Sequence, residues 1–336
     1  MKKIFLAAVA MVGMLTSCNT QTDLVQSEAR SDYTQYVNPL MGTQSSFELS
    51  TGNTYPAIAM PWGMNFWTPR TNRIGDGWQY TYTANKIYGF EQTHQPSPWI
   101  NDYGQFSLMP VTGEVEMDER KRASWFSHKG EVALPHYYKV YLAEYDVVTE
   151  MAPTERASMF RFTFPDADSY VVVDAYDRGS SIKVIPEENK IIGYTTRNSG
   201  GVPENFKNYF VVVFDKPFTY KATFSNDVKP AKPDASVPVT LKEGKLEQTD
   251  FHTGAVIGFK TKKGEKVHAR VASSFISPEQ AELNLKELGN DNFDKIVEKG
   301  KNRWNEVLGK ADVQGGNLDQ YRMFYSCLYR SLLFPR

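Results

Sequence analysis

The sequence has little of the material from which disulfide frameworks, zinc sites and thiol active centres are built. Cysteine occurs only at Cys18 and Cys327, and two cysteines cannot form a set of several bridges. The five histidines include no pair at helical metal-ligand spacing, so they predict no zinc site. We interpret Cys327, which lies in an apolar segment, as a small buried hydrophobic residue rather than a nucleophile.

An excess of one charge is also absent. The chain has 38 Lys and Arg against 39 Asp and Glu, a net charge of −1, so its composition predicts neither nucleic acid nor an acidic surface as a partner. No glycine loop of the phosphate-cradling type and no Gly-x-Ser-x-Gly elbow occurs. With 336 residues, 41% of them apolar, the chain is long enough for one large or two ordinary domains with a proper core.

The first residues have the features of a bacterial lipoprotein signal. Lys2 and Lys3 are followed by an apolar run over 4–15 and by Leu-Thr-Ser-Cys at 15–18, which matches a lipobox ending at Cys18. A membrane-spanning helix is the alternative, but this run is shorter than the roughly 20 residues that a bilayer requires. We therefore predict a signal peptide over 1–18, lipidation of Cys18 and a polar tether over 19–32. The protein is then expected at the outer membrane or a periplasm-facing membrane, with cell-surface exposure left open.

Short β-type runs dominate the region from 33 to 276. They occur at 157–164, 170–175, 182–185, 191–194, 209–214, 218–224, 255–260 and 267–275. Turn residues separate these runs and no helical pattern lies between them, which predicts antiparallel strands. We predict a mainly β fold, in which residues 33–276 form a large antiparallel β-sandwich.

The hydrophobic period changes at Ser277, where Ser-Pro-Glu-Gln places a hydroxyl, a proline and a glutamine in the order typical of a helix start. We predict a helix to about residue 288 and a second from about 291 to 309, within a helical linker over 277–312. Residues 318–334 predict a last helix that is apolar nearly all round, and such a helix needs other helices to cover it. We expect residues 313–336 to begin a further helical domain and expect an isolated 33–336 fragment to bind apolar dyes.

The stretch from 52 to 110 is the most unusual in composition. It contains Trp62, Trp67, Trp78 and Trp99, interrupted by proline and glycine and accompanied by polar side chains. Aromatic faces beside hydrogen-bonding groups suit a sugar, which has apolar C–H faces and many hydroxyls. The alternative interpretation is that these aromatic residues fill a β core.

Several short sequence motifs are similar to those of a known family. They are Tyr36-Val-Asn-Pro-Leu-Met-Gly-Thr43, Asn53-Thr-Tyr-Pro56, Met60-Pro-Trp-Gly-Met64, Gly89-Phe with Thr93-His94, Asp102-Tyr-Gly104, Met109-Pro110, Ser277-Pro-Glu-Gln-Ala281, Trp304-Asn305, Phe324-Tyr325 and Leu328-Tyr329. In this order they resemble the N-terminal domain, and then the start of the catalytic domain, of the glycoside hydrolase family 92 α-mannosidases. The resemblance spans nearly everything after residue 35.

The resemblance implies a calcium-dependent, exo-acting enzyme that removes terminal α-mannose from glycans with inversion. Inverting glycosidases use two carboxyl groups as general acid and general base. In the family both lie in an (α/α)6 barrel that follows the sandwich, together with most calcium ligands. We therefore expect the catalytic residues beyond residue 336, a truncated chain that is inactive alone, and its own missing C-terminal catalytic domain as a partner.

Candidate substrate-binding residues come from the aromatic stretch, because the family's sandwich domain lends residues to the sugar pocket. Trp78 and Trp99 would stack on sugar rings, Arg70 and Asp102 would bind vicinal hydroxyls, and His94 and Gln95 would donate or accept single hydrogen bonds. The alternatives are an internal Arg70–Asp102 ion pair and, for Trp62 and Trp67, places in the core. Asp76, Asn101 and Asp102 offer oxygens to calcium but lack the spacing of a calcium loop.

The sequence departs from the commoner family pattern in three loops. The segment 43–51 lacks the usual glycines and histidines, Pro69-Arg70 replaces proline-aspartate, and Gln-Pro-Ser-Pro-Trp follows His94. These loops would face the leaving group, so the linkage is the least determined property; we predict α-1,2 because it is the commonest in the family. The alternative function is a non-catalytic, glycan-binding surface lipoprotein or a remnant.

Overall fold

The computed structural model describes residues 32–44, 54–71, 79–94, 102–198, 200–229 and 238–334. The predicted signal peptide, Cys18 and most of the tether lie outside this part of the chain. Among the helices described, none combines the length and the apolar character that a bilayer crossing requires.

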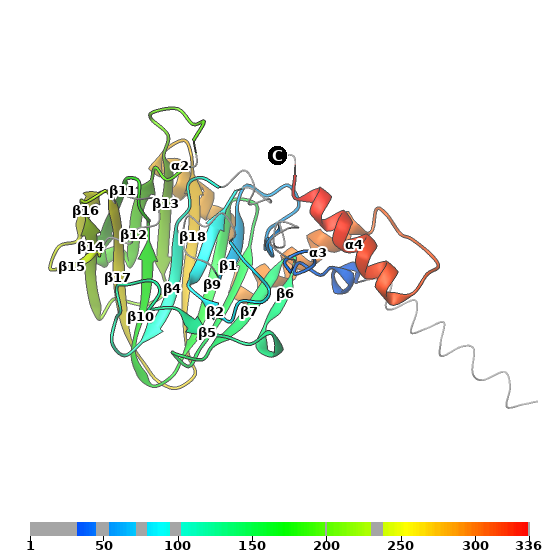
Figure 1. Ribbon diagram of the computed structural model, residues 1–336, viewed down its shortest axis with the longest axis horizontal. Helices are drawn as coiled ribbons and strands as arrows, with labels where there is room; N and C mark the ends of the chain where they lie inside the picture. The colour runs from blue at the N-terminus through cyan, green and yellow to red at the C-terminus, as the bar shows by residue number, and fades with distance from the viewer. Residues whose placement is uncertain are drawn as a thin grey trace, which may run out of the picture.

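Two large antiparallel sheets stack to form the body of the molecule (Figure 1), which confirms the predicted β-sandwich. The first sheet has seven strands in the order β1-β3-β4-β10-β17-β14-β15. Its strands are β1 (Phe66–Arg70), β3 (Gly89–Thr93), β4 (Ser107–Thr112), β10 (Ala167–Asp174), β17 (His252–Thr261), β14 (Tyr220–Asn226) and β15 (Thr240–Glu243).

The second sheet has nine strands in the order β16-β11-β12-β13-β18-β9-β8-β7-β6. Its strands are β16 (Glu247–Asp250), β11 (Ser180–Ile185), β12 (Lys190–Thr195), β13 (Asn208–Phe214), β18 (Glu265–Ser274), β9 (Ala157–Phe164), β8 (Val147–Pro153), β7 (Tyr137–Leu142) and β6 (Val132–Leu134). A small sheet pairs β2 (Lys86–Ile87) with β5 (Ser124–Trp125). Short 3-10 helices lie at Tyr33–Tyr36 (η1), His128–Gly130 (η4), Pro186–Glu188 (η5) and Lys286–Leu288 (η6).

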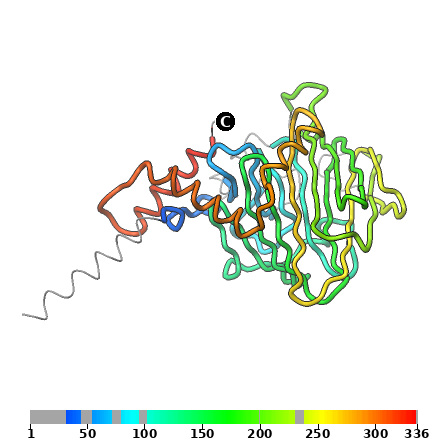
Figure 2. Tube along the Cα trace, turned by 180° about the vertical axis from the view of Figure 1, so that it is seen from behind, coloured from blue at the N-terminus to red at the C-terminus, as the bar shows by residue number. Residues whose placement is uncertain are grey.

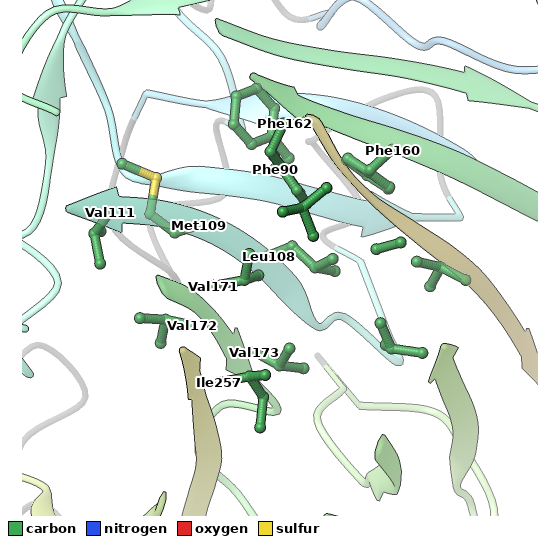
Figure 3. Close-up of a cluster of buried hydrophobic side chains, with 14 of the residues drawn as sticks. Phe90, Leu108, Met109, Val111, Phe160, Phe162, Val171, Val172, Val173 and Ile257 are labelled. Carbon is green, nitrogen blue, oxygen red and sulfur yellow. The ribbon is translucent and has the colours of Figure 1, made fainter. Parts of the chain in front are cut away.

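The main core lies between the two sheets. Phe90 and Leu108 of the first sheet and Phe160 and Phe162 of the second belong to one buried cluster, together with Val171 and its neighbours (Figure 3). Trp67, fully buried, meets Phe160 edge-on at 4.8 Å between ring centroids. Most aromatic side chains of the described part of 52–110 are therefore core residues, as the alternative interpretation held.

Trp62 is the exception, because 41% of its side chain is exposed. It lies in the turn between Ile58 and Trp67, which form an isolated antiparallel bridge, and its φ of 55° is in the left-handed region. The prediction that Trp62 packs in the core is wrong. The turn lies beside the end of helix α4, where the Trp62 N–H donates to Leu332 O at 2.9 Å, and the sequence pattern does not show this contact.

The three α-helices follow the strands, and the first starts where its capping residues predicted. Helix α2 (Pro278–Leu285) begins after Ser277, whose hydroxyl accepts the Gln280 N–H at 3.2 Å. Helix α3 (Phe293–Leu308) is capped by the Asn292 side chain. Helix α4 (Leu318–Leu332) has a full capping box between Asn317 and Gln320.

Helix α4 has one packed side and one exposed side, so it is not buried all round. Tyr325, Ser326 and Tyr329 are buried, whereas Met323 and Phe324 are exposed. Leu318, at the start of the helix, is also exposed, so apolar side chains lie on both sides of α4. Cys327 is exposed, so its interpretation as a buried hydrophobic residue is wrong; it lies on the helix side away from Tyr325 and Tyr329.

A second core joins the N-terminal segment to helices α3 and α4, beside the sandwich (Figures 1 and 2). Val37, Tyr55 and Ala57 pack there with Trp304 and Tyr329. We call the described residues 33–44 and 54–60 the N-terminal segment. Its apolar side chains, except Ile58, pack against the helices rather than between the sheets, although we assigned them to the sandwich by position in the chain. Helices α2 and the start of α3 cover the nine-stranded sheet through a third cluster around Phe293 and Ile296.

Candidate functional site

Arg70, one of the predicted site residues, lies at the end of β1. Its Nη2 donates to Glu119 Oε2 at 2.8 Å, and its Nε lies 3.5 Å from Glu91 Oε2. The guanidinium also lies over the rings of Tyr88 and Tyr176, at 5.7 and 5.2 Å from their centroids. Because only 1% of Arg70 is exposed, its charge interacts with partners inside the protein. The alternative Arg70–Asp102 ion pair is wrong, since Arg70 pairs with Glu119 and Glu91.

Glu91 lies on the face of the seven-stranded sheet that points away from the sandwich core. Phe90 and Gln92 point inward, so alternation turns Glu91 outward beside its register partners Thr68 and Ser107. Its side chain is fully buried, and burial raises the pKa of Glu91 to about 8 although the charge of Arg70 opposes this shift. Neither carboxylate oxygen accepts a hydrogen bond from the residues that the structure describes.

Asp174 continues this row of polar side chains, because it is the register partner of Ser107 on β10. Its carboxylate contacts Arg122 Nη2 at 3.3 Å and His252 Nε2 at 2.7 Å, and it accepts the Tyr176 N–H at 2.9 Å. Burial would raise the pKa of Asp174, but His252 and Arg122 outweigh burial and lower it. The Tyr176 hydroxyl donates to Ser107 at 2.6 Å and ties the row to the segment after β10.

We name these residues the outer-face network: Arg70, Glu91, Ser107, Glu119, Arg122, Asp174, Tyr176 and His252. Its acidic and basic side chains form ion pairs that connect the seven-stranded sheet to the segment 113–123. The sequence motifs did not single out Glu91, Glu119, Arg122, Asp174 or Tyr176. One signal was available for Glu91, because it follows the core residue Phe90 within a strand and must point to the opposite face.

His94 and Asp102 lie at the other end of β3. The Asp102 carboxylate accepts the backbone N–H of His94 at 2.8 Å and that of Tyr103 at 2.8 Å. The His94 ring lies 2.7 Å from the Tyr103 carbonyl oxygen through Nδ1 and packs on Tyr103 and Phe275. Both side chains are buried, with 1% and 5% exposure. In this arrangement they join the chain before residue 95 to the chain after residue 101.

The predicted residues are therefore not gathered in one place. In the β1–β3 register Arg70 pairs with Gly89, whereas Thr93, next to His94, pairs with Phe66 at the opposite end. Trp78, Gln95 and Trp99 lie outside the described residues, as do Asp76 and Asn101. Contact of any of the six predicted residues with a sugar stays a prediction. Arg70 is buried close before the stretch that carries Trp78. His94 and Asp102 are buried on either side of the stretch that carries Gln95 and Trp99. All three are therefore placed to support residues that could contact a sugar.

The described residues do not offer a calcium site. No group of three or more His, Cys, Asp or Glu side chains in the described ranges could hold a metal ion. Asp102, the described member of the predicted oxygen set, already accepts two backbone N–H groups. We therefore derive no calcium-dependent step from these residues.

Comparison with known proteins follows the division seen in the fold. The model of the glycosyl hydrolase family 92 N-terminal domain matches residues 36–274, and that of the family 92 catalytic domain matches residues 280–336. A search of curated proteins finds no match.

Solved structures similar to this chain include two mannosidases of Bacteroides thetaiotaomicron. A family GH92 inverting mannosidase is 47% identical, with a TM-score of 0.84 over 91% of this chain and 40% of its own. A family GH92 α-mannosidase is 31% identical, with a TM-score of 0.77 over 90% of this chain and 42% of its own. A third structure, of that second enzyme with mannoimidazole, has a TM-score of 0.76 at 31% identity over 90% of this chain and 40% of its own. The chain thus spans about two fifths of the length of these mannosidases.

Proposed function

The chain belongs to glycosyl hydrolase family 92, and from that premise we propose that the protein is an exo-acting α-mannosidase that releases terminal α-mannose from glycans with inversion. The observation that carries the proposal is the 47% identity to an inverting mannosidase over 91% of this chain. In this proposal residues 1–336 supply the N-terminal domain and the start of the catalytic domain. The two catalytic carboxyl groups are expected beyond residue 336.

Two sets of buried polar contacts are consistent with this proposal. The outer-face network holds Arg70 at the end of β1, before the segment that carries Trp78. The Asp102 carboxylate holds His94 after the end of β3, before the segment that carries Gln95 and Trp99. Such support matters because a displacement of about 1 Å in a binding group costs an enzyme up to about a hundredfold in rate. We propose that Arg70, His94 and Asp102 serve the substrate by supporting these segments.

The experiment is hydrolysis of α-mannosides by the protein encoded by the full open reading frame. We expect free mannose, and proton NMR of the first product should show the β-anomer that inversion requires. Glycan binding without mannose release would instead favour the alternative, a non-catalytic glycan-binding surface lipoprotein or remnant. Mannobiosides of each linkage, compared by kcat/KM, test the proposed preference for α-1,2.

Calcium dependence is part of the proposal and is supported by the family alone. The ligands would lie mostly outside residues 1–336. We expect activity to be lost in excess EDTA and restored by added calcium, whereas full turnover in EDTA would contradict a calcium-assisted mechanism.

Location outside the cytoplasm, with a lipid anchor at Cys18, is also proposed. The supporting features are Lys2, Lys3, the apolar run over 4–15 and the lipobox. Labelling with a radioactive fatty acid should mark the protein and should fail in Cys18→Ala. A labelled Cys18→Ala variant would contradict this assignment.

A further inference from the structure

Helix α4 carries one side chain that contacts the N-terminal segment at four separate oxygen atoms. The Arg330 guanidinium donates to the carbonyl oxygens of Tyr55 at 2.9 Å, Pro39 at 2.7 Å and Met41 at 3.1 Å, and to Thr54 Oγ1 at 3.4 Å. These partners lie more than 270 positions earlier in the chain. Within the described residues, no salt bridge connects Arg330 to a carboxylate, so its donors are committed to neutral oxygens.

The four oxygens belong to two stretches of backbone that lie side by side. Thr54 Oγ1 donates to the Met41 carbonyl oxygen at 3.4 Å. Gly42 has a φ of +82° and packs closely against Thr54, because a Cβ at this position would lie only 3.2 Å from Thr54 Oγ1. Arg330 therefore binds both stretches, 39–41 and 54–55, and fixes their separation.

This segment depends on side chains because it has little sheet pairing of its own. Between Val37 and Met60 only Ile58 forms a β-bridge among the described residues. Backbone polar groups that lack a ladder need other partners when they are buried. Helix side chains supply them: Tyr329 donates to Ala57 O, Trp304 to Ala59 O at 2.8 Å, and Ser326 accepts from Asn38 N at 2.9 Å.

Arg330 is the member of this group that no other residue type could replace. A guanidinium presents five N–H donors in a fixed planar fork, whereas a lysine ammonium is a compact group with three. Only the fork can reach Tyr55 O through one terminal nitrogen while the other serves Pro39, Met41 and Thr54. The half-buried position beside Tyr329 keeps the side chain extended along the segment.

We propose that Arg330 is a positioning residue of the enzyme, which holds residues 39–41 and 54–55 against helix α4 and so sets the geometry between the N-terminal and catalytic parts. This inference rests on the proposed α-mannosidase function. The family match changes from the N-terminal to the catalytic model between residues 274 and 280. Arg330 thus belongs to the catalytic match and its four partners to the N-terminal match.

The test compares Arg330→Lys and Arg330→Met with Arg322→Lys and Arg322→Met in the full-length enzyme. Arg322 is a matched control because it lies on the same helix, is 54% exposed and forms an ion pair with the exposed Asp319 at 3.5 Å. We expect both Arg330 variants to raise KM for an α-mannoside by about tenfold or more, and Arg330→Lys to restore little, because it lacks the fork. Both Arg322 variants should match the wild type.

The readouts separate positioning from folding. A purely structural role would lower the fraction of active enzyme, which scales kcat at constant KM. Unchanged KM in both Arg330 variants would therefore overturn the proposal. Hydrogen exchange provides a second measure that needs no activity: Arg330→Lys should accelerate exchange in 37–60 while leaving β9 and β18 unchanged. Equal exchange in 37–60 would overturn the proposal, whereas an inactive wild type with accelerated exchange in the variant would count against the proposed function alone.

Discussion

The outer-face network and the N-terminal segment solve opposite problems with polar side chains. In the network, sheet ladders already bond the backbone, so Arg70 is free to pair with Glu119, and Asp174 with Arg122 and His252. In the N-terminal segment a ladder is nearly absent, and Arg330, Tyr329 and Trp304 bond its backbone instead. In the outer-face network, polar side chains therefore add contacts to a sheet whose backbone is already bonded. In the N-terminal segment they supply the hydrogen bonds that hold the backbone in place.

The strongest test of this contrast is to remove a helix side chain that hydrogen-bonds the backbone of the N-terminal segment. Trp304 is fully buried and donates to Ala59 O. Trp304→Ala should lower the free energy of unfolding by about 4 kcal/mol, because it leaves a large cavity and an unpaired carbonyl. Urea denaturation measures the loss. Trp304→Phe keeps most of the volume and should cost clearly less; equal losses would contradict the cavity explanation.

The next largest effect should come from the network. Arg70→Met leaves Glu119 and Glu91 without their buried cation, and breaking a buried ion pair costs about 3 kcal/mol. The same denaturation assay applies. Adding Glu119→Gln should recover part of the loss, because the amide needs no counter-charge where Arg70 Nη2 contacts Glu119 at 2.8 Å. A double variant no more stable than Arg70→Met would show that the Glu119 carboxylate does not depend on Arg70.

Lowering the pH tests the helix side of the comparison, because the buried His136 lies beside helix α3. His136 lies against Gly300, and burial together with the charge of Lys301 lowers the pKa of His136 to about 4. Between pH 6.5 and 4 the unfolded chain binds a proton that the folded chain does not. Stability should therefore fall by about 3 kcal/mol as pH drops through this window. His136→Gln should flatten the dependence in a pH series of denaturation curves; an unchanged slope would contradict it.

The smallest effect removes one hydroxyl from each region. Tyr329→Phe loses the bond to Ala57 O, and Tyr176→Phe loses the bond to Ser107 Oγ. Each should cost about 1 kcal/mol in thermal or urea denaturation. Hydrogen exchange distinguishes them: only Tyr329→Phe should accelerate exchange in 54–60, because the ladder protects the sheet in Tyr176→Phe. Equal acceleration in both regions would refute the contrast.

Sequence patterns predicted the strands and helix starts closely. The run at 157–164 is β9, and the runs at 182–185 and 191–194 fall within β11 and β12, joined by η5 at Pro186–Glu188. Alternation and capping succeed here because they depend on neighbours a few residues apart. The same reasoning failed for Trp62 and Cys327, whose exposure depends on which distant surfaces meet.

The candidate site divides in the same way. Residue types in 52–110 indicated a polar and aromatic ligand surface, but they could not show that Arg70 pairs with Glu119 or that Asp102 closes the chain beside His94. Those partners come from loops and strands whose separation in sequence carries no pairing signal. The structure adds internal partners for Arg70, His94 and Asp102, and their contact with a sugar stays a prediction.

The sequence by itself determined the β character, the helix boundaries, the family words and the lipobox, because short-range periodicity and side-chain chemistry encode each of them locally. Only the tertiary structure decided that residues 33–44 and 54–60 pack with the last helix and that Arg330 binds their backbone across some 270 positions. Carbonyl oxygens are identical in every residue, so no sequence pattern can say which of them a distant guanidinium will meet.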